Sequence, residues 1–404
     1  MRVAFVAAFV FASAMAIAQT TEARDKVKLS GGREVEGRIV RVGEDEIVLR
    51  TGSVDRVIPR KQIESFSSVA DRHRELMKEW RDARPEDADA MMALAQRAAD
   101  RGLPHEARLF RWYAALARPD DPQIHATLGN RDRRGSFEVQ IHDRWVPFAK
   151  ADALGEDFAD AWRLRSEHFE MQCSAGLRAG LDSLMDLEAL YHAMHDLFGR
   201  ELSLFELVEP VDVRLYRSQQ QMPALSGTVL AYFNADEHAL YTFFENGRAQ
   251  ALMHEGTHAL LHFFFVRAAK SRGSLPAWLD EGWAEYMDAR LQQRVPGKPT
   301  LLEKSVNAAH FATLAQAKKA DDLYGVHRLL NFKTGDFLAS SRQSTKYAQA
   351  WALFRYLFEH GEAALRKQFF EYLREAAAGQ GQASTFRRIF ARQEQELERE
   401  PWHP

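Results

Sequence analysis

The stretch 252–262, LMHEGTHALLH, constrains the fold and chemistry of this chain more than any other. His254 and His258 are four residues apart, so in a helix both imidazoles lie on one face, one turn apart. Both rings can then reach a single metal ion, and Glu255 between them can reach a water molecule bound to that ion. We therefore expect a helix that begins near Asn246 or Gly247 and carries a metal site, and a second element that supplies the remaining ligand.

A catalytic zinc site needs three protein ligands and one open position. His262 lies about 12 Å along the helix axis from His254, and side chains so placed do not converge on one ion, so we expect His262 to be a packed or hydrogen-bonding histidine. Glu281, in the stretch 275–286 (LPAWLDEGWAEY), follows His258 by 23 positions. That spacing lets the first helix end and a second helix return antiparallel to it. Glu281 is therefore the candidate third ligand.

HEGTH followed by WLDEGWAEY resembles the gluzincin branch of the zinc metallopeptidases and is similar to bacterial, largely uncharacterised peptidase-MA-like families. The resemblance covers residues 165–398. It implies a zincin-like α+β domain with one zinc ion, whose ligands are His254, His258 and Glu281. The metzincin pattern would require Gly at 261 and His at 264, and this chain has Leu261 and Phe264 there.

The resemblance also implies roles for residues around the ion. Glu255 is the general base that takes a proton from water and delivers it to the leaving amine. Glu285, one turn after Glu281, is an acid that hydrogen-bonds a ligand histidine. Gluzincins stabilise the oxyanion with a Tyr or His from a later helix, and Tyr347, which opens an apolar helical pattern, is our first candidate. The alternatives are Tyr324, His310 and His327.

Two further features bear on specificity. Zinc aminopeptidases carry a Gly-x-Met-Glu-Asn segment that binds the substrate amino terminus. Residues 244–247 (FENG) match that segment only in part. Endopeptidase or narrow self-processing chemistry therefore stays more open than aminopeptidase activity. The resemblance also implies that the strand before the helix, here 238–244, is an edge strand that pairs with substrate backbone.

The first residues have the plan of a secretory signal peptide over 1–18: Arg2, an apolar run and a small-residue cleavage site. The apolar run of about 14 residues is short for a spanning helix, which needs roughly 20. We expect an exported protein, periplasmic or extracellular, without a stable membrane span after cleavage. The single cysteine, Cys173, excludes an intrachain disulfide, and we interpret it as a small half-buried residue. The formal net charge of −3 gives no reason to expect a nucleic-acid partner.

Changes of pattern along the chain predict a multidomain α+β protein. The segment 24–68 consists of short β-branched runs between Gly/Asp turns, which favours a small SH3-like or Sm-like barrel. The apolar period then becomes helical, and 91–117 is either a tetratricopeptide-like unit or a plain helical hairpin. The expected parts are a signal peptide (1–18), the small barrel (24–68), a helical hairpin linker (69–122), a small β connector (123–164) and the metallopeptidase domain (165–398).

These observations predict an exported zinc-dependent peptidase that acts on a peptide or protein substrate. A second interpretation is a catalytically silent envelope scaffold, in which the barrel and the helical hairpin bind a protein partner. The intact Glu255 argues against the scaffold, because a retired site often loses its base before its ligands. A third interpretation is a zinc hydrolase with a non-peptide substrate.

Overall fold

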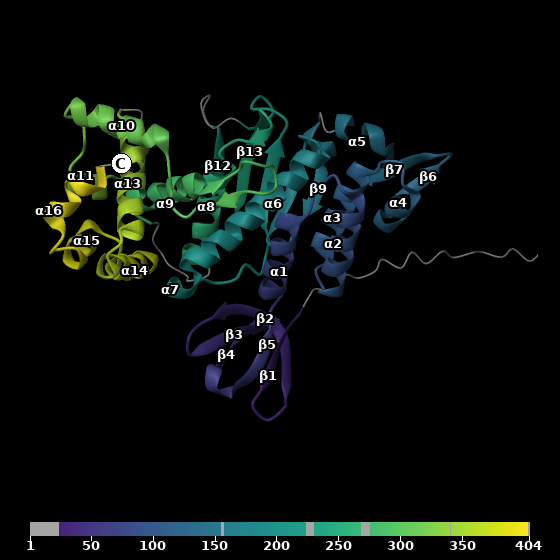
Figure 1. Ribbon diagram of the computed structural model, residues 1–404, viewed down its shortest axis with the longest axis horizontal. Helices are drawn as coiled ribbons and strands as arrows, with labels where there is room; N and C mark the ends of the chain where they lie inside the picture. The colour runs from purple at the N-terminus through teal and green to yellow at the C-terminus, as the bar shows by residue number, and fades with distance from the viewer. Residues whose placement is uncertain (1–23, 155–156, 224–229, 268–274, 340, 403–404) are drawn as a thin grey trace, which may run out of the picture.

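The computed structural model describes residues 24–154, 157–223, 230–267, 275–339 and 341–402 of the chain, so the predicted signal peptide lies outside the described residues. The fold is a mixture of small antiparallel sheets, one larger mixed sheet and many helices. Figure 1 shows the N-terminal sheet beside the end of α1, the larger sheet in the middle, and the C-terminal helices on the opposite side from α2 and α3. No helix in the described ranges is both long and apolar enough to cross a membrane.

The N-terminal sheet forms where the β-branched runs predicted strands, and its order is β4-β3-β2-β1-β5 with every pair antiparallel. Its strands are β1 (Asp25–Leu29), β2 (Glu34–Val42), β3 (Glu46–Thr51), β4 (Val54–Pro59) and β5 (Ile63–Ser67). Val27, Ile39 and Leu49 are among the residues of its own small core. Pairing of β4 with β5, which would close a barrel, is not found within the described residues. The predicted closed barrel is therefore corrected to a five-stranded antiparallel sheet.

Four helices and a small sheet follow the N-terminal sheet. They are α1 (Val69–Asp82), α2 (Ala88–Asp100), α3 (Pro104–Ala117), α4 (Pro122–Leu128), β6 (Arg131–Arg133), β7 (Ser136–Ile141), β8 (Arg144–Pro147) and α5 (Phe148–Leu154). Helix starts follow sequence signals: the Ser68 hydroxyl accepts a hydrogen bond from Asp71 N, and Pro104 opens α3. Leu76 and Phe110 belong to the same hydrophobic core as the C-terminal region. These helices thus share one hydrophobic core with that region, and α3 contacts α6.

The larger sheet is mixed, in the order β12-β13-β11-β10-β9. Its strands are β9 (Trp162–Arg165), β10 (Phe169–Cys173), β11 (Val211–Tyr216), β12 (Ala231–Asn234), β13 (Ala239–Glu245) and the short β14 (Arg248–Ala249) that pairs with β13. The strands β10, β11 and β13 are parallel, whereas β12 and β9 run antiparallel to their neighbours. Helix α6 (Leu177–Met194) connects β10 to β11; it continues into a π-helical turn, His195–Gly199, and the short α7 (Arg200–Leu202).

Two expectations for this sheet are wrong. The strand expected at the edge, 238–244, corresponds to β13, which pairs with β12 on one side and β11 on the other. Among the described residues, the strand at that edge of the sheet is β12 instead. The metal-site helix was expected to begin near Asn246 or Gly247, but both residues have positive φ angles, of 52° and 80°, and turn the chain from β13 into β14. Asn-Gly is a strong hairpin signal, and it prevails here over the helical pattern that follows.

Cys173, on β10, is fully buried, and burial raises the pKa of its thiol to about 12. Its sulfur lies 3.4 Å from the carbonyl oxygen of Gly176. Cys173 is thus a small packing residue, as expected, but it is fully buried and not half-buried.

The rest of the chain is almost wholly helical. It contains α8 (Leu252–Leu261) with a π-helical turn (His262–Arg267), α9 (Ala277–Arg290), β15 (Leu291–Gln292), β16 (Thr300–Leu301), α10 (Ala308–Lys319), α11 (Val326–Leu330), α12 (Thr334–Leu338), α13 (Gln343–Glu359), α14 (Ala363–Ala377), α15 (Ala383–Ile389) and α16 (Glu394–Leu397). Figure 1 shows α8 between the larger sheet and α9, with α13 beyond α9. The candidate ligand residues lie on α8 and α9, which are the two facing helices that the sequence predicted.

Candidate metal centre

Glycines let the helices around the centre approach closely. A Cβ on Gly256 of α8 would lie 2.8 Å from Leu190 and 2.9 Å from Leu187, both on α6. A Cβ on Gly282 of α9 would lie 2.6 Å from the carbonyl oxygen of Ala350 on α13. Both glycines are therefore required for close contact between the helices. This packing offsets the low helix propensity of glycine, which costs about 1 kcal/mol relative to Ala.

His254, His258 and Glu281 meet between α8 and α9. The two Nε2 atoms are 3.2 Å apart. The Oε2 atom of Glu281 lies 3.3 Å from Nε2 of His254 and 3.5 Å from Nε2 of His258. The predicted set of three thus forms a nearly equilateral triangle of donor atoms, and it is one of two groups in the described residues that could hold a metal ion.

The triangle fits a zinc ion. Tetrahedral zinc with bonds of 2.0–2.1 Å separates its ligand atoms by about 3.3–3.4 Å, close to the three distances found here. Oε2 of Glu281 is buried and accepts no hydrogen bond from the part of the chain that the structure describes, as expected of an oxygen reserved for a cation. Two imidazoles and one carboxylate form a ligand set of the catalytic type, which leaves a fourth position for water or substrate.

Outer carboxylates orient both histidines. Nδ1 of His258 lies 3.2 Å from Asp280, and Nδ1 of His254 lies 3.5 Å from Glu285. The other oxygen of Glu285 is hydrogen-bonded to Nε2 of His310 at 2.7 Å. Carboxylates in this position fix the tautomer of a ligand histidine and raise its basicity. The sequence patterns did not single out Asp280, although its place directly before Glu281 on α9 was a usable indication.

The carboxylates of Glu281, Asp280 and Glu285 surround the two histidines and give the centre an affinity for positive charge. Burial alone would lower the pKa of His254, but the Glu281, Glu255 and Glu285 carboxylates together outweigh it and raise that pKa to about 9. The pKa of His258 is likewise raised against burial, mainly by Asp280. Burial would raise the pKa of Glu281, yet the two histidines lower it strongly. A site that holds protons this firmly suits a divalent cation, which can displace those protons.

Glu255 lies beside the triangle and next to the edge of the larger sheet. Its Oε2 accepts a hydrogen bond of 3.1 Å from the backbone N–H of Phe233 on β12. Burial raises the pKa of this carboxyl group, and this raised pKa suits a group that must accept and return a proton. The Phe233 N–H points to Glu255 and not into the ladder with β13, so β12 presents its unpaired side to the centre.

Tyr347 is the oxyanion candidate whose ring lies nearest the ligands, with its centroid 6.3 Å from that of His254. Burial raises the pKa of its phenol, which keeps the hydroxyl protonated and able to donate. Of the alternatives, His310 is engaged with Glu285, and the ring of Tyr324 packs on Phe332 at 5.0 Å.

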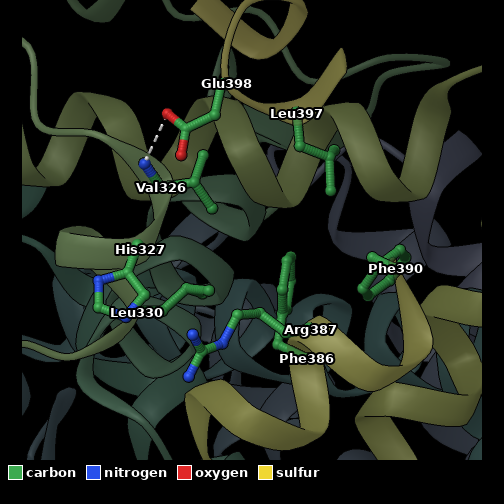
Figure 2. A pocket seen from close by; sticks show the side chains of 8 residues that line it. All are labelled: Val326, His327, Leu330, Phe386, Arg387, Phe390, Leu397 and Glu398. Atoms are coloured by element: carbon green, nitrogen blue, oxygen red, sulfur yellow. Dashed lines mark hydrogen bonds between the residues drawn. The ribbon is translucent and has the colours of Figure 1, made fainter. Parts of the chain in front are cut away.

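The remaining alternative, His327, lies away from the centre. It lines a small cavity of about 30 Å³ among the C-terminal helices. Figure 2 shows this cavity together with Phe386, Phe390 and Glu398, and the Glu398 carboxylate accepts a hydrogen bond of 3.0 Å from Val326 N.

His262 lies outside the triangle, as the helix geometry predicted. Its ring centroid is 5.3 Å from that of Phe233 and 5.3 Å from that of His238. It therefore packs between the end of α8 and the β12–β13 hairpin.

Comparison with known proteins gives one family match. A family model described as a protein of unknown function (DUF1570) matches residues 248–380, about one third of the chain. The matched part includes the three triangle residues and Tyr347. No curated protein matches the chain. The function therefore has to be argued from the centre itself.

Proposed function

We propose that this chain is a zinc-dependent peptidase. The observation that carries the proposal is the triangle of His254, His258 and Glu281, whose edges of 3.2, 3.3 and 3.5 Å match tetrahedral zinc. Glu255 beside it supports a hydrolytic role, since a purely structural site needs four protein ligands and no neighbouring base. The resemblance of HEGTH and WLDEGWAEY to gluzincins supports peptide bonds as the substrate class.

The side chains divide the work of hydrolysis. A zinc ion, when bound, would act as a Lewis acid on the scissile carbonyl and would lower the pKa of its bound water to about 7. Glu255 takes the proton from the attacking water and returns it to the leaving amine. Tyr347 donates a hydrogen bond to the oxygen that becomes negative at the scissile carbonyl. Asp280 and Glu285 keep the two histidine rings in place.

The unpaired edge of β12 supports an extended peptide as the substrate. An exposed strand edge pairs with extended backbone through main-chain hydrogen bonds. Because Phe233 N–H lies at this edge and contacts Glu255, a peptide added here would pass alongside the base. This arrangement favours a peptide bond of an extended chain as the bond that is cleaved.

The experiment compares the wild-type protein with Glu255→Gln and Tyr347→Phe. Each protein is purified, its zinc content is measured by mass spectrometry, and it is incubated with a peptide library whose products are sequenced. We expect about one zinc per chain in all three proteins. We expect a loss of cleavage of more than about a thousandfold in Glu255→Gln and about a hundredfold in Tyr347→Phe.

Three outcomes decide against parts of this proposal. A wild-type protein without bound metal would exclude a zinc enzyme. Bound zinc without any cleavage would favour the scaffold or a non-peptide substrate. Equal cleavage by wild type and Glu255→Gln would remove Glu255 from the mechanism.

We further propose export, on the pattern of residues 1–18, which lie outside the described residues. Amino-terminal sequencing of protein recovered from a secreting host tests this proposal. A mature chain that begins just after Ala18 would support it, and a chain that keeps Met1–Ala18 would contradict it.

A further inference from the structure

A second cluster of histidines and carboxylates lies where α1 and α3 pack on α6, away from α8 and α9. His73 comes from α1, Glu106 from α3, and Glu188 and His192 from α6, while His168 precedes β10. The first four of these in the chain, His73, Glu106, His168 and Glu188, are 0% exposed, and His192 is 7% exposed. Ionisable side chains buried this completely are rare unless they are paired.

His73 lies at the centre of the cluster: it is hydrogen-bonded to His192 and Glu106, and its Nε2 lies 3.8 Å from Oε2 of Glu188. Nδ1 of His73 lies 2.8 Å from Nε2 of His192, and its Nε2 lies 3.1 Å from Oε1 of Glu106. Glu188 accepts from His168 twice, from the backbone N–H at 2.9 Å and from Nδ1 at 2.7 Å. One side chain of α1 is thereby bonded to both α3 and α6.

These contacts fit a shared proton better than a metal ion. His73, Glu188 and His192 offer donor atoms within 4.8 Å of one another. The distance of 2.8 Å between His73 and His192, however, is that of an N–H···N hydrogen bond and is shorter than the spacing of about 3.3 Å around zinc. Both ring nitrogens of His73 are already engaged, one with each neighbour.

We propose that the His73–His192 pair is a one-proton latch that holds α1 on α6, and that either gain or loss of a proton opens it. With one proton between the facing nitrogens, one histidine donates and the other accepts. A second proton places two N–H groups against each other, and removal of the first proton leaves the buried carboxylates without a cation. The latch is independent of the proposed peptidase function, because it uses no residue of the metal centre.

The groups around the pair support this proton count. Burial lowers the pKa of His73, but the Glu188 and Glu106 carboxylates outweigh it and raise the pKa to about 9. Burial and the neighbouring His73 lower the pKa of His192 well below its usual value. The other charged or titratable groups that act on the pair are Glu167, His168, His195 and Arg74.

The sign of the pH dependence follows from these shifts. A histidine with a raised pKa stabilises the closed latch below its free pKa of about 6.5, and this stabilisation is lost as pH rises through about 9. A histidine with a lowered pKa stabilises the closed latch above about 6.5, and this stabilisation is lost as pH falls below that value. The latch is therefore tightest near pH 6.5. The carboxylates Glu106 and Glu188, whose pKa values are lowered, add to the loss at acid pH.

The latch and the metal-binding helix α8 both contact helix α6. Glu188 and His192 face α1, whereas Leu187 and Leu190 of the same helix contact the position of Gly256 on α8. Helix α6 thus has the latch on one face and the metal-binding helix on another.

Hydrogen–deuterium exchange of the full-length protein tests the latch. Amides of α1 are followed at about pH 5.0, 6.5 and 8.0, with labelling times adjusted for the intrinsic exchange rate. We expect opening of α1 to be least near pH 6.5 and roughly eightfold greater at each of the other two values. In His192→Gln, the side-chain oxygen can still accept from His73 but cannot be protonated, so the increase at acid pH should disappear while the alkaline increase remains. His327→Gln, at an exposed histidine, is the matched control and should behave as wild type.

The wild-type profile alone can overturn the latch. Opening of α1 that is flat, or that changes in one direction only across this range, would contradict a one-proton optimum, even if His192→Gln did not fold. An unchanged acid increase in His192→Gln would also contradict it. A second equivalent of zinc that is lost in His192→Gln but kept in Glu281→Gln would make the cluster a metal site instead.

Discussion

In the part of the chain that the structure describes, two groups of two histidines and a glutamate could hold a metal ion, and they differ in the spacing and hydrogen bonding of their donor atoms. In the centre between α8 and α9 the donor atoms are spaced by 3.2 to 3.5 Å, and the carboxylate oxygen there is without a hydrogen bond from the described residues. In the cluster of α1, α3 and α6, His73 and His192 are 2.8 Å apart, and Glu188 is bonded to His168.

The difference shows that the residue types of a cluster do not by themselves determine whether it binds a metal ion or shares a proton. The same residue types bind a cation where their donor atoms converge on one point and are backed by outer acids such as Asp280 and Glu285. They share protons where they lie in a chain of pairwise contacts. Partial exposure separates them further: the side chains of His254 and His258 are 15% exposed, whereas those of His73 and Glu188 are 0% exposed.

The largest expected effect separates the clusters by their metal content. Glu281→Gln removes a ligand and should weaken zinc binding by more than about a hundredfold, since loss of even an outer partner costs 10–100-fold. Glu188→Gln makes the same chemical change in the other cluster and should keep about one zinc per chain. Mass spectrometry after dialysis measures both proteins. Loss of zinc in Glu188→Gln would break the distinction.

The second effect concerns stability, and here we expect Glu188→Gln to be the more damaging of the two variants. Glu188→Gln removes one of the two buried carboxylates beside His73 and the hydrogen-bonded partner of His168, and it should lower the free energy of unfolding by about 3–5 kcal/mol. Urea titration followed by circular dichroism measures this loss in metal-free protein. Glu371→Gln, at an exposed acid of α14, is the control and should stay within about 0.5 kcal/mol of wild type. A Glu188→Gln protein as stable as this control would show that the buried network contributes little.

A smaller effect tests the outer acids of the metal centre. Asp280→Asn should weaken zinc binding by about 10–100-fold, because the amide orients His258 but no longer raises its basicity. Competition with a zinc chelator measures the affinity. Asp336→Asn, at an exposed acid of α12, should bind zinc as wild type does. Equal affinities for the two variants would mean that Asp280 does not support the ligand.

The smallest effect concerns the contact between α6 and α8, which lies between the clusters. In Gly256→Ala the new methyl group would meet Leu187 and Leu190, and this crowding should outweigh the better helix propensity of Ala, for a net loss of about 1–2 kcal/mol. Gly335→Ala on α12 is matched, since a Cβ there meets nothing within 4 Å, and it should be neutral or stabilising by up to about 1 kcal/mol. Thermal unfolding compares the two. If both variants gained stability, the close approach of α6 and α8 would not constrain position 256.

The sequence predicted much of the local structure because local patterns carry it. The strands of the first sheet were recognisable from β-branched runs between turns. Strand pairing is not local, so the edge position of 238–244 was wrong, and closure of the first sheet into a barrel is not detected among the described residues. The shift of the α8 start to Leu252 came from a turn, Asn246-Gly247, that competed with a helical pattern.

The candidate centre was predictable for a similar reason. His254 and His258 are related by helical spacing, and Glu281 lies on the next helix, so short-range rules bring them together. His73 and Glu188 are far apart in the chain and belong to no motif. Their meeting depends on how α1 packs on α6, and this is a property of the whole fold.

The single cysteine has a practical consequence. Cys173 lies on β10 with 0% exposure, and its pKa of about 12 leaves almost no thiolate near neutral pH. A thiol-alkylating reagent should therefore react only with molecules in which the larger sheet has opened. Each chain would take up a single label whose rate of addition reports that opening. The rate of alkylation of Cys173 therefore measures opening of the sheet beside the candidate centre without any engineered probe.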